Sequence, residues 1–440
     1  MADLFQKKQW VGEFFTNGEY QSRFVGELSY CPEAGVKLSY SITGHQVPNQ
    51  SNIVHGVLST GEACTLVGNF FPQNSGVKLS KGLSSRFGTV GFLCLVIGAH
   101  LEDEESIYKV NFSLTGLQEF FFPKGYKDLV KYSSEPLLSI DTKYGKLSVG
   151  NNAQFGSLSR DVTTQIYSRD EQAQKALQET FSELEESYPE ANFMLKKDIS
   201  YRIYLQNENG GDIKSFYEYI NEIANLFSLL IYSPVFPDSI KLVKEVGGFS
   251  EQLSVYPTML LDKRTMEISL QERTHFHMPI TRSKIDLELV LSNWLGSEDN
   301  YSTLISRIQN ESGFRSEHEL HGEIVLYGTQ LEFISYDEDM KLKKYEYPID
   351  TYASVKIKKT IEKVFNTVNI TDIGVGISSL RNEIAHVGRP KKILKVISMN
   401  QLMELSLCLQ LTIIGWVLFK LGVSKDVIDV YQDKRLPDKS

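Results

Sequence analysis

Residues 371–392 read TDIGVGISSLRNEIAHVGRPKK, and this stretch decides how the C-terminal third of the chain is interpreted. Its isoleucines and leucine recur at the three- and four-residue spacing of an amphipathic helix. They form one apolar stripe made of Ile373, Ile377, Leu380 and Ile384. Asn382 and His386 are four residues apart, so they share the opposite face of the predicted helix. A core histidine would lie in the stripe, and His386 does not.

The predicted helix runs from Asp372 to His386 and stops at Gly388 and Pro390, two residues that end helices. Arg389, Lys391 and Lys392 follow at once and form a local basic patch. This patch matters because the chain of 440 residues has a net charge of −9, so its overall field does not attract nucleic acid.

Helices dominate the chain from about residue 286 onward. The apolar periodicity predicts helices over 319–333, 351–366 and 399–421, in addition to the helix over 372–386. The first of these carries Leu320, Ile324, Tyr327 and Leu331 on one side. Together the four segments indicate a C-terminal helical bundle.

The first ~120 residues have the spacing of short strands between turns. Val36, Leu38, Tyr40 and Ile42 alternate as a half-buried strand requires, and strands are also predicted over 53–59, 64–70, 90–97 and 107–114. Helices are predicted over 169–187 and 213–232, followed by a β-like region over 240–285. The sequence therefore predicts an α+β protein with a β-rich module over 1–285 and an all-α bundle over 286–440.

Arg381 to His386, RNEIAH, is an Rx4H pattern on the third helix of the predicted bundle, and it resembles the HEPN superfamily. The helix ending in Leu331 and Glu332 and the final apolar helix look like the Apea-type branch of these domains. The front of the chain is similar to the N-terminal domain of the ApeA anti-phage proteins. The stretches that carry this second resemblance are Gly12-Glu-Phe-Phe, Gly26-Glu-Leu, Gly35 to Leu38, and HGVLSTGEACTLV at 55–67.

The resemblance implies a metal-independent endoribonuclease without a cofactor, acting in abortive infection as a homodimer with two facing RxxxxH helices. RNA, with tRNA as one candidate, would be the substrate, and a phage product would be the trigger. The implied catalytic residues are Arg381, Asn382 and His386. Imidazole is suited to proton transfer at neutral pH, and arginine gives planar donors to phosphate. Arg389, Lys391, Lys392 and Glu332 are candidates for substrate binding.

Other interpretations compete with catalysis. Arg381 could form a salt bridge at a bundle surface, with His386 near a helix C-terminus, where a cation is favourable in any case. The bundle could then be a non-catalytic dimerisation domain beside a ligand-binding β module. A carbohydrate-binding or hydrolytic β domain would need paired carboxylates in a cleft, and the sequence identifies no such pair. A second Rx4–6H match joins Arg315 to His321.

Metal and membrane signals are weak. HELH at 318–321 is one residue short of the HExxH zinc pattern, and His275 and His277 would supply only two ligands from one face of a strand. No Walker A, GxGxxG or GxSxG motif occurs.

The four cysteines lack CxxC spacing and are predicted to be free thiols in a reducing compartment. The start turns polar too early for a signal peptide, and the apolar run at 405–419 is shorter than a membrane span, so a buried helix is expected there. A cytoplasmic protein is expected.

Overall fold

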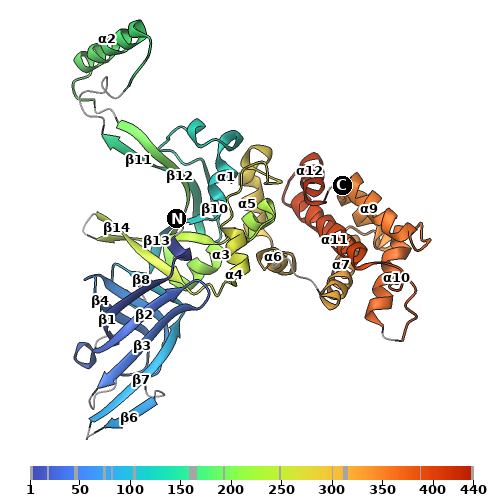
Figure 1. Cartoon of the computed structure of the whole chain (residues 1–440), viewed down its shortest axis with the longest axis horizontal. Helices are drawn as coiled ribbons and strands as arrows, with labels where there is room; N and C mark the ends of the chain where they lie inside the picture. Colours follow the sequence, from blue (N-terminus) through green and yellow to red (C-terminus); the bar gives the residue numbers. More distant parts are fainter. Residues whose placement is uncertain are drawn as a thin grey trace.

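The computed structural model describes residues 3–16, 19–43, 48–72, 76–80, 83–102, 106–157, 166–191, 194–246, 249–299, 301–310, 316–386 and 388–437. A sheet lies on one side of the molecule and a helical bundle on the other, joined through short helices (Figure 1). Arg315, and with it the second Rx4–6H match, lies outside the described residues.

The described strands form one 14-stranded sheet. They are β1 (Lys8–Thr16), β2 (Phe24–Cys31), β3 (Gly35–Thr43), β4 (Ser51–Leu58), β5 (Ala63–Phe70), β6 (Gly76–Ser80), β7 (Leu83–Phe92), β8 (Cys94–Ile97), β9 (Ile107–Leu114), β10 (Leu138–Thr142), β11 (Gly145–Ser157), β12 (Met194–Gly211), β13 (Pro237–Val246) and β14 (Phe249–Pro257). Their order across the sheet is β10-β11-β12-β9-β13-β14-β8-β5-β4-β1-β2-β3-β7-β6.

Neighbouring strands pair antiparallel throughout this order. In β3 the predicted alternation is present, because Val36, Leu38, Tyr40 and Ile42 are buried. The register places Leu28 of β2 opposite Leu38 of β3, so both leucines face the same core. This part of the fold confirms the predicted β-rich N-terminal module.

Four helices accompany the sheet: α1 (Leu117–Phe121), α2 (Glu171–Ser187), α3 (Ile213–Ile231) and α4 (Lys263–Ser269). Helix α3 buries residues along most of its length and packs on β9 and β13. Helix α2 buries none of its residues and stands at the end of the β11–β12 arm, away from the rest of the molecule (Figure 1). One part of the core therefore lies between α3 and strands β9 and β13.

The C-terminal part contains α5 (Leu287–Gly296), α6 (Ser302–Gln309), α7 (Glu317–Asp337), α8 (Glu346–Tyr352), α9 (Val355–Asn366), α10 (Ile373–Ala385), α11 (Met399–Lys420) and α12 (Lys425–Arg435). Helices α7, α8, α9 and α12 all pack on α11. This arrangement confirms the predicted class, a β-rich module followed by a helical bundle.

Helix α11 is the one described helix whose length and apolarity would allow it to cross a membrane. Most of it is buried inside the bundle, including the polar side chains of Gln410 and Thr412. The predicted burial of this helix is confirmed, and its apolar character follows from its central position among other helices.

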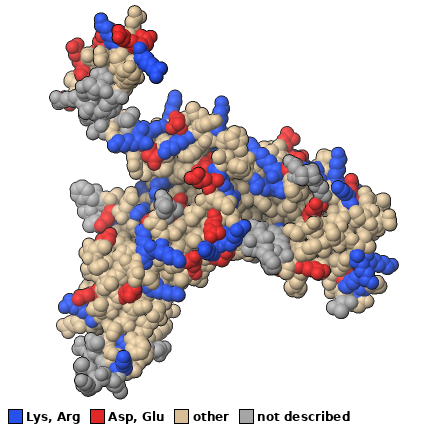
Figure 2. Space-filling model, viewed as in Figure 1, with Lys and Arg blue, Asp and Glu red and all other residues tan. Residues whose placement is uncertain are grey.

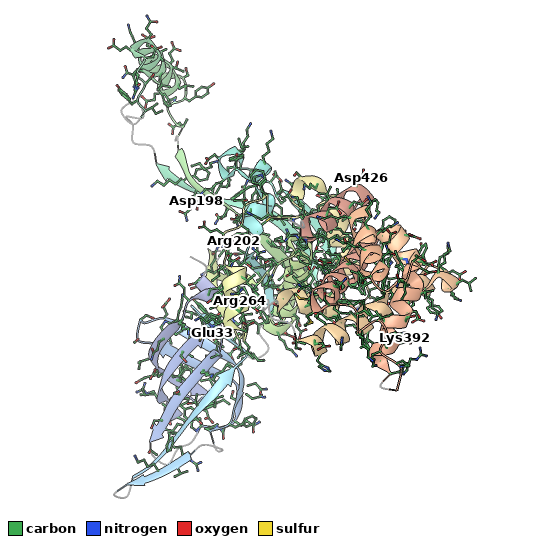
Figure 3. All side chains as sticks on the ribbon, turned by 45° about the vertical axis from the view of Figure 1, so that its right-hand side comes forward. Glu33, Asp198, Arg202, Arg264, Lys392 and Asp426 are labelled. Carbon is green, nitrogen blue, oxygen red and sulfur yellow. The ribbon has the colours of Figure 1, made fainter. Side chains whose placement is uncertain are left out.

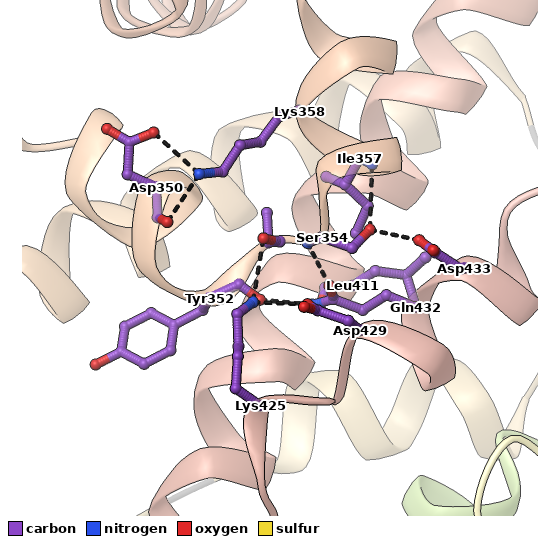
Figure 4. Close-up of polar contacts among 11 residues, drawn as sticks. Asp350, Tyr352, Ser354, Ile357, Lys358, Leu411, Lys425, Asp429, Gln432 and Asp433 are labelled. Atoms are coloured by element: carbon purple, nitrogen blue, oxygen red, sulfur yellow. Dashed lines mark hydrogen bonds and ion pairs between the residues drawn. The ribbon is translucent and has the colours of Figure 1, made fainter. Parts of the chain in front are cut away.

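The junction of α8 and α9 corrects the prediction of one helix over 351–366. The chain leaves the helical path at Ala353, and Ser354 caps α9 by accepting a hydrogen bond from the Ile357 N–H. Gln432 of α12 is fully buried and fixes this break: its Oε1 accepts from the Ser354 N–H at 2.6 Å, and its Nε2 donates to the Tyr352 and Leu411 carbonyls at 2.8 and 2.9 Å (Figure 4). These partners come from distant segments, so local periodicity did not predict the break.

Three further predictions differ from the structure. The β-like region expected over 240–285 ends at Pro257, and α4 follows it. His275 and His277 therefore lie in a turn rather than on one face of a strand. The strand expected over 90–97 is two strands, β7 and β8, interrupted at Leu93. Helix α12 was not predicted.

Candidate active site at the end of helix α10

Helix α10 places the predicted catalytic side chains, and its own sequence explains its ends. The Asp372 carboxylate caps the N-terminus by accepting from the Val375 N–H at 2.8 Å. Ile377 and Leu380 are buried, as the apolar stripe predicted. The helix ends at Ala385, and His386 follows with extended dihedrals while its N–H still bonds to the Asn382 carbonyl at 3.2 Å. The predicted helix thus exceeds the observed one by one residue at each end.

Arg381 points from α10 toward α7 and is held by three polar groups. Its Nη1 lies 3.4 Å from Glu332 Oε2 and 3.4 Å from the Tyr345 hydroxyl, and its Nη2 donates to Thr329 Oγ1 at 3.2 Å. Its side chain is 28% exposed, and its Nε is buried without a hydrogen-bond partner in the described part of the chain. The guanidinium is therefore oriented but only partly satisfied.

Glu332 bridges Arg381 to a second cation. Its Oε1 accepts from Lys344 Nζ at 2.6 Å, and this hydrogen bond raises the pKa of Lys344 above its usual value. Gly328 lies one turn earlier on α7, and a Cβ there would come within 3.3 Å of Arg381 Cδ. The absence of a side chain at Gly328 gives the stem of Arg381 room against α7.

His386 is exposed and Asn382 is half-buried at the same end of α10. Within the described residues neither side chain has a hydrogen-bond or ion-pair partner. The structure brings both side chains to the helix end that carries Arg381. Their catalytic roles stay predictions.

Glu383 organises the segment that follows the helix. Its buried carboxylate accepts hydrogen bonds from the backbone N–H groups of Lys392, Ile393 and Leu394 at 2.9 to 3.2 Å. Lys391 Nζ donates to the carbonyls of Glu383 and, at 3.0 Å, His386. These contacts fold the basic segment back onto the end of α10.

The predicted basic patch divides into two kinds of side chain. Lys391 satisfies carbonyls at the helix C-terminus, where a cation is favoured. Arg389 and Lys392 are exposed, and their side chains form no hydrogen bond or ion pair with any described residue. Lysine and arginine side chains gather at this tip of the helical part, where Lys392 is labelled (Figures 2 and 3). The binding of substrate by this basic patch stays a prediction.

Sequence reasoning missed several residues of this site: Thr329, Tyr345, Lys344, Gly328 and Glu383. The first four belong to other segments, and only the fold brings them to Arg381. Glu383 left a signal, since it is a charged residue at the edge of the apolar stripe. A carboxylate in that position must be satisfied by nearby donors.

The alternative metal sites have structural explanations. Glu319 forms a capping box with Ser316 at the start of α7, which places His318 on the exposed first turn. His277 Nδ1 lies 3.0 Å from Thr274 Oγ1. No group of three potential metal ligands occurs among the residues that the structure describes. The four cysteines are free thiols, and Cys64, Cys94 and Cys408 are buried.

Comparison with known proteins identifies both parts of the chain. The family model of ApeA N-terminal domain 1 matches residues 9–294, and that of the Apea-like HEPN matches residues 329–427. No curated protein and no solved structure matches the chain. The first matched range covers nearly all of the sheet, and the second covers the C-terminal end of α7 and helices α8 to α11. Arg381 to His386 lie inside the HEPN match. The chain therefore belongs to the ApeA N-terminal domain 1 family and carries a C-terminal Apea-like HEPN domain.

Proposed function

We propose that the helical part is a metal-independent endoribonuclease of anti-phage defence. The observation that supports it best is the arrangement at the end of α10: Arg381 is oriented by three partners, and the exposed imidazole of His386 has none among the described residues. A fixed cation and a free imidazole are the groups that RNA transesterification needs.

The proposed reaction begins when the 2′-hydroxyl of RNA attacks the adjacent phosphorus atom. His386 removes the hydroxyl proton, and a protonated imidazole gives a proton to the 5′ oxygen as its bond to phosphorus breaks. Arg381 stabilises the negative charge that develops on the phosphate oxygens. Asn382 orients the phosphate or the imidazole, while Arg389, Lys391 and Lys392 attract the RNA backbone. Glu332 holds Arg381 in place.

One copy of the chain offers one His386, so the proposal includes a homodimer in which a second copy supplies the other imidazole. Helix α7 supports this, because Leu326 and Phe333 are 39% and 55% exposed on a face that also carries Thr329. Thr329 contacts Arg381, so the exposed apolar side chains lie beside the proposed site. Burying them against a second copy would bring two sites together.

The N-terminal module, which we place at residues 1–285, would restrain the bundle at 286–440 until a phage product is present. We propose that the protein acts in the cytoplasm, where RNA such as tRNA is available. The rival function is a non-catalytic dimerisation or binding protein. It is favoured by the contact of Arg381 with Glu332, because a salt bridge within the chain is also what a structural arginine would form.

The test is to express wild-type protein, His386→Ala and His318→Ala in bacteria, with and without phage. His318 is the matched control because it is an exposed histidine of the same domain, at the start of α7. We expect wild type and His318→Ala to degrade RNA and block infection, and His386→Ala to do neither. If His386→Ala protects as well as wild type and RNA stays intact in both, the binding function replaces the catalytic one.

A further inference from the structure

A pocket of about 440 Å³ lies where the N-terminal part meets the helical bundle, and its walls come from both. Tyr232 to Pro234 follow α3, Arg273 follows α4, Gln410 belongs to α11 and Arg435 ends α12. This size is in the range of pockets that hold small organic molecules. It is separate from the end of α10, since none of its lining residues belongs to the proposed ribonuclease site.

The charge of the pocket is positive. Arg307, Arg273 and Arg435 line it, together with one carboxylate, the exposed Glu272. Arg307 is paired with Glu323 at 3.4 Å. Arg273 and Arg435 have no carboxylate partner among the described residues; they donate only to the carbonyls of Ile268 and His277. Burial, together with the charge of Arg435, lowers the pKa of Arg273 from its usual value.

Buried donors in this pocket lack acceptors. Ser233 Oγ, Gln410 Nε2 and Arg435 Nε are all buried, and none has a hydrogen-bond partner within the described residues. Ser233 is only 5% exposed, and Gln410 is fully buried. Three donors without an acceptor around one cavity are uncommon, because buried polar groups are nearly always hydrogen-bonded. An oxygen-rich anion would satisfy them.

The backbone beside the pocket is also unusual. Tyr232 adopts a left-handed conformation with φ of 55°, which a bulky non-glycine residue rarely does. Its hydroxyl donates to Gln410 Oε1 at 3.0 Å, and Arg435 lies over its ring at 5.4 Å. Tyr232 thus links the end of α3 to α11 and α12 at the place where the unpaired groups meet. Strained residues of this kind occur often at ligand sites.

We propose that this pocket binds a phosphate-bearing small molecule, with Arg273 and Arg435 holding the phosphate from opposite parts of the chain. Arginine presents planar paired donors to phosphate oxygens, and the donors of Ser233 and Gln410 complete the set. Because its ligand contacts α4, α11 and α12 at once, binding would fasten the N-terminal part to the helical bundle. The proposal does not depend on ribonuclease activity.

The test uses the full chain with inorganic pyrophosphate, adenosine 5′-monophosphate, and adenosine as the uncharged comparison. Thermal unfolding and isothermal titration calorimetry give the shift in Tm and the Kd. We expect a phosphate-bearing probe to raise Tm and adenosine to leave it unchanged. Tighter binding of pyrophosphate would identify an inorganic ligand, and tighter binding of the nucleotide would identify a phosphate ester.

Variants locate the binding. Arg273→Gln and Arg435→Gln should each weaken binding at least about tenfold, because each removes a charge-assisted donor. Arg264→Gln is the matched control, since this exposed arginine of α4, labelled in Figure 3, does not line the pocket. Arg435→Lys should bind weakly because the charge stays but the paired donors are lost. Circular dichroism checks that each variant is folded, and Arg273→Gln serves alone if Arg435→Gln is not. No binding to the wild type at millimolar probe, or equal binding by Arg273→Gln, would overturn the proposal.

Discussion

The buried carboxylate of Glu383 should hold in place the segment that carries the basic patch. Glu383→Ala removes the acceptor of three backbone N–H groups, those of Lys392, Ile393 and Leu394. A hydrogen bond to a charged group contributes about 1.5–3 kcal/mol, so three would give roughly 4–9 kcal/mol if nothing relaxed. Lys392 is exposed and Leu394 half-buried, and water can reach their N–H groups. Ile393 is 3% exposed, so its N–H stays unsatisfied. We therefore expect the free energy of local unfolding of this segment to decrease by about 2–4 kcal/mol.

Hydrogen exchange measured by mass spectrometry tests this value locally, which suits a chain of several structural parts. A loss of about 3 kcal/mol corresponds to roughly 100-fold faster exchange in peptides covering 391–397. Glu383→Gln keeps the shape and one acceptor oxygen and should have a smaller effect. Glu362→Ala on α9 is the control, because Glu362 is exposed. Unchanged exchange in Glu383→Ala would show that the Glu383 carboxylate does not hold this segment in place.

Three further predictions concern other parts of the fold. Gln432→Ala leaves the buried Ser354 N–H and the Tyr352 and Leu411 carbonyls without their partner. Thermal or urea unfolding should therefore show that the free energy of unfolding falls by about 2–4 kcal/mol, and a decrease below ~1 kcal/mol would contradict the prediction. Burial raises the pKa of Asp238 from 3.8 to about 6, so the protonated carboxyl contributes to the free energy of unfolding below pH 3.8, and this contribution is lost as the pH rises through about 6. Asp238→Asn should therefore flatten the dependence of the free energy of unfolding on pH in this window by up to ~3 kcal/mol, and an unchanged pH dependence would contradict this. Glu332→Gln should change the free energy of unfolding by less than ~1 kcal/mol because Lys344 and Arg381 are partly exposed, yet it should slow RNA cleavage roughly tenfold because Arg381 is no longer held in place. Faster cleavage would contradict this and would mean that Glu332 keeps Arg381 away from the substrate.

The helices that bury one stripe against a neighbour could be predicted from the sequence. Leu320, Ile324, Tyr327 and Leu331 are all buried on α7, as their spacing required. The strands with alternating burial, such as β3, were equally visible. The break between α8 and α9 was not, because Gln432 of α12 holds it from 78 residues away along the chain. Strands β1, β2, β6, β10 and β11 were also not predicted. The pairing of β11 with β12 joins segments separated by helix α2.

The candidate site divides in the same way. The side chains on α10 could be predicted, because Arg381, Asn382 and His386 belong to one motif on one helix. The partners of Arg381 come from other segments, Thr329 and Glu332 on α7 and Tyr345 before α8. Only Glu332 was suggested by the sequence, and its contact with Arg381 depends on how α7 and α10 pack.

The proposed mechanism requires His386 to take part in RNA cleavage without a metal. The most direct measurement is cleavage of purified RNA by purified wild-type, His386→Ala and His318→Ala proteins in the presence of EDTA, with analysis of the product ends. We predict that wild type and His318→Ala cleave RNA and leave 2′,3′-cyclic phosphates, while His386→Ala is at least about 100-fold slower. Equal cleavage by His386→Ala, or cleavage that EDTA abolishes, would contradict this mechanism.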